Sequence, residues 1–164
     1  MIEIVIRIAL AGMLGGAALA KLASPRSSEA ALATFGFGEG PLRRLAWAGL
    51  IALELSLAAA VVAGSDAAAY GAAALMAMFA ALMVSALLRG RAGAPCACFG
   101  SRSRVGLASV ARNLALTVGF AILPSLPRES LSADQWLGLV LSVALIAVAA
   151  LAVARRPARS TGAG

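Results

Sequence analysis

The chain of 164 residues contains no histidine, and this absence excludes several chemistries at once. A Ser-His-Asp triad, a histidine-ligated zinc or haem and a histidine proton shuttle all need an imidazole ring. Cysteine is almost as scarce, since the only two are Cys96 and Cys98. Secreted domains held together by a disulfide framework use more cysteines at wider spacing. The Cys96–Cys98 pair is therefore the main candidate for chemistry in this sequence.

Charged residues make up only 13% of the chain and aromatic residues 5%, while 62% is hydrophobic. An ordinary soluble domain is about 45–50% apolar and about 25% charged. A soluble chain of this size could not cover so much apolar surface, and disorder and a collagen-like structure are excluded as well. The net charge of +7 is typical of nucleic-acid-binding proteins, but here the charges cluster between long uncharged runs. That pattern indicates an integral membrane protein with the lipid bilayer as its partner and no nucleic acid.

Five segments are apolar over about the twenty residues that a helix needs to span a bilayer. They are Ile2–Leu22, Leu45–Gly64, Ala67–Leu88, Val105–Pro124 and Trp136–Ala154. We therefore predict an all-α, integral membrane helical bundle with four core transmembrane helices and a fifth, C-terminal one. The expected organisation is a four-helix domain at 1–125, an additional helix within 126–154 and a basic cytoplasmic tail at 155–164. Gly12 and Gly16 form a GxxxG pair, which lets a neighbouring backbone approach closely but often arises by chance in segments rich in alanine and glycine.

The positive charges are unevenly divided between the two sides of the membrane. One side carries Lys21, Arg26, Arg43, Arg44, Arg89, Arg91, Arg102, Arg104, Arg155, Arg156 and Arg159. The other side carries Arg128 and, near the start of the first segment, Arg7. The positive-inside rule then predicts a multi-pass protein of a bacterial-type inner membrane. Its N-terminus is expected outside, and its C-terminus and cysteine pair on the cytoplasmic side.

Cys96 and Cys98 lie between the third and fourth segments, in a turn confined by Pro95 and Gly100. Cysteines two residues apart can close a disulfide, but the small ring departs from relaxed geometry. Strained disulfides are the more easily reduced ones and tend to be labile or catalytic. Flanking positive charge favours the thiolate, which is the attacking species, and the N-terminus of the next helix adds to the effect. The flanking cations are Arg89, Arg91, Arg102 and Arg104.

Two other interpretations of the cysteines stay open at this point. The pair could be two inert thiols in a turn. It could also bind Cu(I), which accepts sulfur ligands readily, with methionines of the preceding helix nearby. These are Met76, Met78 and Met83, for which packing or lipid contact is the simpler expectation. Two thiolates alone fall short of the four ligands of a structural zinc site.

Ionisable groups inside the apolar segments are a second informative feature. Glu54 lies in the middle of the second segment, and Arg112 with Asn113 lies in the fourth. Such groups are expensive in hydrocarbon and are expected to face the bundle interior with a partner. Glu54 lies roughly 14 Å and Arg112 roughly 10 Å from the end that bears the cysteines, at about 1.5 Å per residue. We therefore predict that Glu54 pairs with Arg112, either to hold the bundle together or to end a proton or ligand path beneath the cysteine loop.

Several local patterns occur in the same order as in a known family. They are Ala11-Gly12, Lys21-Leu22, Pro25, Glu54-Leu55, Cys96-Ala97-Cys98-Phe99-Gly100 and Arg112-Asn113-Leu114. With these, the sequence resembles the MauE/DoxX-like redox-associated membrane proteins, and the MauE branch in particular. The resemblance covers roughly residues 1–125, so the fifth apolar segment lies outside it.

The resemblance implies a compact bundle of four core helices and a membrane thiol–disulfide role with Cys96 and Cys98 as the redox couple. MauE is associated with maturation of methylamine dehydrogenase and acts beside a thioredoxin-like protein. A thioredoxin-like protein or a disulfide-bearing client is therefore the expected partner here, without any implication of methylamine metabolism. The expected supporting residues are Lys21, Glu54, Pro95, Phe99, Gly100, Arg112 and Asn113. No bound cofactor is indicated, although a quinone stays open.

Two other classes of function remain alternatives. One is a membrane protein that handles Cu(I) or another soft metal. The other is a non-catalytic subunit or chaperone that assembles a larger membrane complex.

Overall fold

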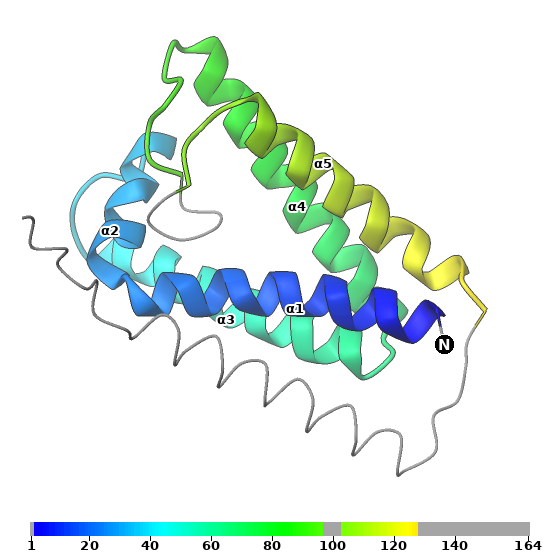
Figure 1. Cartoon of the computed structure of the whole chain (residues 1–164). Coiled ribbons are helices and arrows are strands. Elements are labelled where there is room, and N and C mark those ends of the chain that lie inside the picture. Colours follow the sequence, from blue (N-terminus) through cyan, green and yellow to red (C-terminus); the bar gives the residue numbers. More distant parts are fainter. Residues whose placement is uncertain (1, 97–102, 128–164) are drawn as a thin grey trace, which may run out of the picture. The chain divides into compact units, whose positions relative to one another are not determined.

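A computed structural model describes residues 2–96 and 103–127 of the chain (Figure 1). Every regular element in these ranges is helical. The elements are α1 (Ile2–Ala23), α2 (Pro25–Ala30), η1 (Ala31–Phe35), α3 (Pro41–Val62), α4 (Asp66–Leu88), α5 (Leu107–Ile122) and η2 (Leu123–Ser125). The compact unit that they build is Met1–Pro127, and the predicted fifth helix, Trp136–Ala154, lies outside the described residues.

Four of the described helices are long and apolar enough to cross a membrane: α1, α3, α4, and α5 with its continuation into η2. The prediction of an all-α membrane bundle with four core helices is therefore confirmed. Helix α3 begins at Pro41, four residues before the predicted start at Leu45. Gly40 precedes it with φ +126°, a left-handed conformation that favours glycine, and proline suits the first turn because it lacks an N–H that would go unused.

The four long helices pack as two neighbouring pairs, α1 along α3 and α4 along α5, and α3 also contacts α4 (Figure 1). Small side chains allow α4 to approach its neighbours closely, because Ala69 and Ala72 are completely buried on it. Larger side chains such as Leu14, Met76 and Phe120 fill the remaining core. The core is thus built from close contact between small residues, with a few large ones between them.

Two glycines mark close approaches between helices, and neither belongs to the predicted GxxxG pair. A Cβ atom added to Gly71 would lie 3.1 Å from Leu57 Cδ2, and one added to Gly119 would lie 3.2 Å from Leu10 Cδ2. A Cβ atom added to Gly12 or Gly16 would have nothing within 4 Å in the described structure. The GxxxG spacing in α1 therefore does not mark a helix contact within this unit.

The C-terminal ends of α1 and α4 lie at the same end of the bundle as the N-terminal ends of α3 and α5 (Figure 1). The short segment formed by α2 and η1 lies there too. Hydrogen bonds join this segment to residues that follow α4, through Thr34, Arg91 and Pro95. We call this end, which carries Cys96, the cysteine end of the bundle.

Candidate functional site

A short hairpin holds Cys96 between α4 and α5. Residues 93–96 run antiparallel to residues 103–105, and three backbone hydrogen bonds of 2.9 Å join them. One of these runs from the Cys96 N–H to the Ser103 carbonyl, so Cys96 occupies the last paired position among the described residues. Cys98 follows two residues later, outside the described residues, together with Phe99 and Gly100.

The same hairpin explains why α5 begins later than the sequence predicts. Val105, the expected first residue of the fourth span, donates its N–H to the Ala94 carbonyl at 2.9 Å. A residue that pairs across a hairpin cannot also begin the helix, which starts at Leu107 instead. The hairpin thereby fixes Cys96 relative to the ends of two transmembrane helices.

Cys96 is only 1% exposed and belongs to the hydrophobic core. Its Sγ lies 3.7 Å from Sδ of Met83, a fully buried residue of α4. Met76 is buried as well, whereas Met78 is 49% exposed on the outer surface of the bundle. Met76 is therefore a packing residue, and Met78 lies where lipid contact is expected. Met83 packs in the core as well, and its sulfur contacts the sulfur of Cys96.

Thr34 of η1 connects the hairpin to a distant part of the chain. Its Oγ1 donates to the Pro95 carbonyl at 3.1 Å, and its own carbonyl accepts from Arg91 Nη1 at 2.6 Å. One residue thus holds the peptide group directly before Cys96 and a side chain at the base of the hairpin. Arg104 Nη1 adds a bond of 3.0 Å to the Gly93 carbonyl.

Replacing Thr34 by valine removes the hydroxyl donor and keeps the size of the side chain. A hydrogen bond of this kind contributes about 0.5–1.5 kcal/mol, so local opening around Pro95 is expected to become about two- to tenfold more frequent. The measurement is the alkylation rate of Cys96 in the reduced protein, followed on the Cys96 peptide by mass spectrometry. Thr34→Ser keeps the hydroxyl and serves as the control. Equal rates in the valine variant and the parent would contradict the role of this bond.

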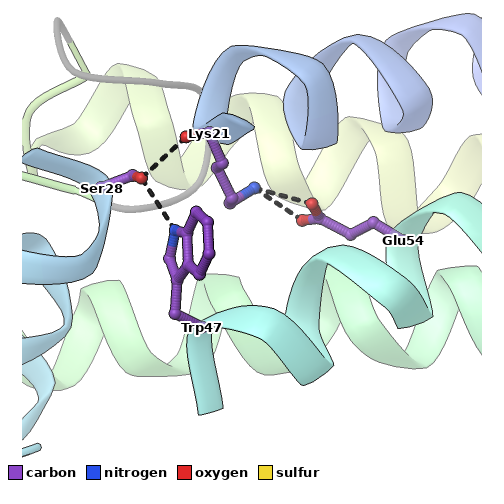
Figure 2. A network of polar contacts seen from close by, with 4 residues as sticks. All are labelled: Lys21, Ser28, Trp47 and Glu54. Atoms are coloured by element: carbon purple, nitrogen blue, oxygen red, sulfur yellow. Dashed lines mark hydrogen bonds and ion pairs between the residues drawn. The ribbon is translucent and has the colours of Figure 1, made fainter. Parts of the chain in front are cut away.

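A second cluster, also at the cysteine end, is a buried ion pair between α1 and α3. Lys21 Nζ lies 2.8 Å from both carboxylate oxygens of Glu54, and both side chains are completely buried (Figure 2). The predicted pairing of Glu54 with Arg112 is therefore wrong. Helix α3 packs along α1, whereas α5, which carries Arg112, packs along α4. Lys21, expected among the loop charges, lies in the last turn of α1 inside the bundle.

Ser28 of α2 fixes the short α2–η1 segment beside this ion pair (Figure 2). Trp47 Nε1 on α3 donates to Ser28 Oγ at 2.9 Å. The Ser28 hydroxyl lies within donating distance of three carbonyls that end α1 and begin α2. These belong to Lys21 at 3.1 Å, Ser24 at 2.9 Å and Pro25 at 3.2 Å. The serine thus ties α1, α2 and α3 together.

Trp47→Phe removes the indole donor while keeping an aromatic ring. In a double-mutant cycle with Ser28→Ala we expect a coupling of about 0.5–1.5 kcal/mol in the free energy of unfolding. The cycle is measured from unfolding of the detergent-solubilised protein. If the losses of unfolding free energy in the two single variants are strictly additive in the double variant, the bond between Trp47 and Ser28 does not contribute to stability.

Asn113, next to Arg112 on α5, makes its hydrogen bonds within that helix rather than with Glu54. Asn113 is fully buried, and its Nδ2 donates to the Ser109 carbonyl at 2.8 Å. The Asn113 carbonyl accepts from Thr117 Oγ1 at 2.9 Å. These bonds stay within one helix, so the structure places Asn113 in the packing of α5 and not beside the buried ion pair.

A second buried ion pair, which was not expected from the sequence, lies near the N-terminus of α1. Arg7 Nη2 lies 2.6 Å from Glu3 Oε1, and Arg7 Nη1 donates to the Val61 carbonyl at 3.0 Å. Both side chains are buried. The spacing of four residues between opposite charges on one helix was the signal that could have revealed this pair. Thr34 and Ser28 carried no comparable signal.

The fold and the site together define a multi-pass membrane protein: a four-helix bundle that holds a cysteine-bearing hairpin at one end beside a buried lysine–glutamate pair. The chain belongs to the family described as methylamine utilisation protein MauE, whose family model matches residues 1–126. The match ends one residue after η2, so it covers the four-helix bundle. No curated protein and no solved structure matches the chain.

Proposed function

We propose that this protein is a membrane accessory protein that exchanges electrons with a partner through a Cys96–Cys98 dithiol/disulfide couple. In this role it supports disulfide formation or maturation of a client protein. The observation that carries the proposal is the backbone hydrogen bond to Ser103 that fixes Cys96 in the hairpin, two residues before the second cysteine. Membership of the MauE family supports an accessory role in the membrane.

The spacing of the two cysteines suits reversible bond formation. Cα atoms two residues apart are separated by at most about 7 Å, and a disulfide joins Cα atoms about 4.4–6.8 Å apart. Cys96 is held by its backbone bond to Ser103 and by its contact with Met83. A pair with one member fixed loses less conformational freedom when the bond closes, while the small ring keeps the disulfide easy to reduce.

The exchange runs in two balanced steps. A cysteine thiolate of the pair attacks a disulfide of the partner, which forms a mixed disulfide and releases one partner thiolate. The second cysteine of the pair, as a thiolate, then attacks the mixed disulfide, closes the Cys96–Cys98 bond and releases the other partner thiolate. Two electrons pass from the pair to the partner, and the reverse sequence oxidises a partner dithiol. A thioredoxin-like protein is the partner class that suits this chemistry.

The charge distribution supports a cytoplasmic position for the cysteine end. Lys21 no longer counts as a loop charge, because it is buried against Glu54. The remaining cations of that side still far outnumber those of the other, where Arg7 is paired with Glu3. By the positive-inside rule the pair then faces the cytoplasm, where it can receive electrons from cytosolic thiols.

The proposal is tested by equilibrating the purified full-length protein with mixtures of reduced and oxidised glutathione. Free thiols are then tagged with a maleimide of known mass after acid quenching. We expect one transition in which both cysteines change together, as a two-electron couple requires. In the Cys98→Ser control this transition is lost. A parent protein that keeps both thiols free at every ratio contradicts the proposal.

One contact favours a second candidate function, the handling of Cu(I). Thiolate and thioether sulfur are soft ligands that select Cu(I), and Cys96 Sγ and Met83 Sδ are neighbours at 3.7 Å. If the protein carries copper, the metal should copurify with the parent and be lost from both Cys96→Ser and Met83→Leu. Metal analysis that finds no copper in the protein isolated from copper-supplemented cells excludes this candidate.

A further inference from the structure

The burial and the contacts of Cys96 suit it to one particular step of the exchange. We infer that Cys96 is the resolving cysteine, which closes the disulfide within the chain, and not the cysteine that first attacks a protein partner. This inference rests on the proposed function and assigns a separate task to each sulfur of the pair.

The burial of Cys96 limits which sulfur atoms it can attack. A thiolate attacks a disulfide along the line of the sulfur–sulfur bond, so its sulfur must reach a sulfur atom of the partner. Cys96 is 1% exposed and belongs to the hydrophobic core. A folded partner cannot bring its disulfide into that position, and buried cysteines are generally inert toward external reagents.

Several contacts also hold Cys96 in place. Its N–H is bonded to Ser103, and its sulfur lies against Met83 inside the bundle. The carbonyl of Pro95, in the peptide bond to Cys96, accepts from Thr34. Bringing Cys96 to the surface would break contacts with three separate segments of the chain. The first attack by this residue would therefore require local opening before every turnover.

The resolving step does not require this local opening. Once the other cysteine carries the partner as a mixed disulfide, the sulfur to be attacked belongs to a residue two positions away in the same chain. Cys96, as a thiolate, forms a bond to that sulfur, and the partner leaves as its thiolate. Because Cys96 needs to reach only within its own loop, burial protects it from external disulfides without preventing this step.

The experiment compares two single-cysteine forms of the full-length protein in detergent, Cys96→Ser and Cys98→Ser. The probe is ubiquitin with one introduced cysteine, activated as a mixed disulfide with thionitrobenzoate. Attack transfers ubiquitin to the membrane protein and releases coloured thionitrobenzoate, and the adduct is seen on a non-reducing gel. We expect Cys96→Ser, which keeps Cys98, to react at least about tenfold faster than Cys98→Ser. After unfolding in dodecyl sulfate the two forms should react at similar rates.

The outcomes separate this inference from the proposed function. If Cys98→Ser reacts as fast as Cys96→Ser or faster, the assignment of Cys96 is overturned while the glutathione titration of the parent still supports the redox couple. If neither form reacts in the folded state, the assignment fails as well, because it requires one accessible cysteine. A titration without any transition would overturn the proposed function itself, whichever cysteine the probe prefers.

Discussion

Replacing Lys21 by methionine is expected to lower the free energy of unfolding by about 3–5 kcal/mol, because it leaves the Glu54 carboxylate buried without its partner. Both carboxylate oxygens are 2.8 Å from Lys21 Nζ, and neither side chain is exposed. Glu54→Leu should cost a similar amount, since it leaves the ammonium group buried instead. The measurement is unfolding of the solubilised protein, supported by the amount of folded protein in the membrane.

The combined Lys21→Met and Glu54→Leu variant provides the decisive comparison. Replacing a whole buried ion pair by apolar residues of similar volume is often neutral or stabilising, so most of the lost stability should return. A matched control is Glu29→Gln, which breaks the partly exposed pair with Arg43 at 3.2 Å and should cost at most about 1 kcal/mol. If the combined variant loses as much unfolding free energy as the two single variants together, the pairing of Lys21 with Glu54 is contradicted.

The double variant Cys96→Ser and Cys98→Ser is expected to lose disulfide exchange completely while the bundle stays folded. The oxidised parent should oxidise reduced thioredoxin, which is used as the probe. With the double variant, thioredoxin should be oxidised only at the rate measured without any membrane protein. The chemistry requires sulfur, and serine is close to cysteine in size. The measurement is the consumption of thioredoxin thiols over time.

The Lys21→Met and Glu54→Leu variant serves as the control for this second prediction, since it changes the bundle interior and leaves both sulfurs in place. It should retain exchange with thioredoxin wherever it folds. Oxidation of thioredoxin at the parent rate by the double serine variant would show that the cysteines are not the reacting groups.

The buried ion pair and the cysteine hairpin are connected through the α2–η1 segment. Ser28 attaches the start of this segment to Lys21 and Trp47 beside the ion pair. Thr34 attaches its other end to Pro95, next to Cys96. Ser28 bonds to the backbone carbonyl of Lys21 and not to the ion pair itself. In the proposed function the α2–η1 segment, rather than the Lys21 and Glu54 side chains, therefore helps to hold Cys96 in place.

Hydropathy was sufficient to predict the four membrane helices, because each long apolar run must be buried or face lipid. It also showed that Glu54 needs a partner, but the partner it suggested was wrong. Counting residues along a helix gives the depth of a side chain, not the direction in which it points or the helix that packs against it. Lys21 was misplaced because a lysine at the end of an apolar run looks like a loop charge.

The contacts around Cys96 could not be predicted in the same way. Thr34 and Pro95 are far apart in the sequence, and a single hydrogen bond between them leaves no periodic pattern. The same holds for Met83, whose sulfur meets Cys96 only because the hairpin folds back onto α4. The sequence did identify Cys96 and Cys98 as the chemically distinctive pair, since no other cysteine and no histidine is present.

The most direct measurement of the redox couple is its state in native membranes. Cells that express the full chain are quenched with acid, either untreated or after a brief pulse of dithiothreitol or diamide, and free thiols are tagged before separation on a gel. We expect the reductant and the oxidant to shift the chain between a form with two tags and a form with none, and we expect the shift to reverse when the reagent is removed. A chain that carries two tags under every condition would contradict this expectation.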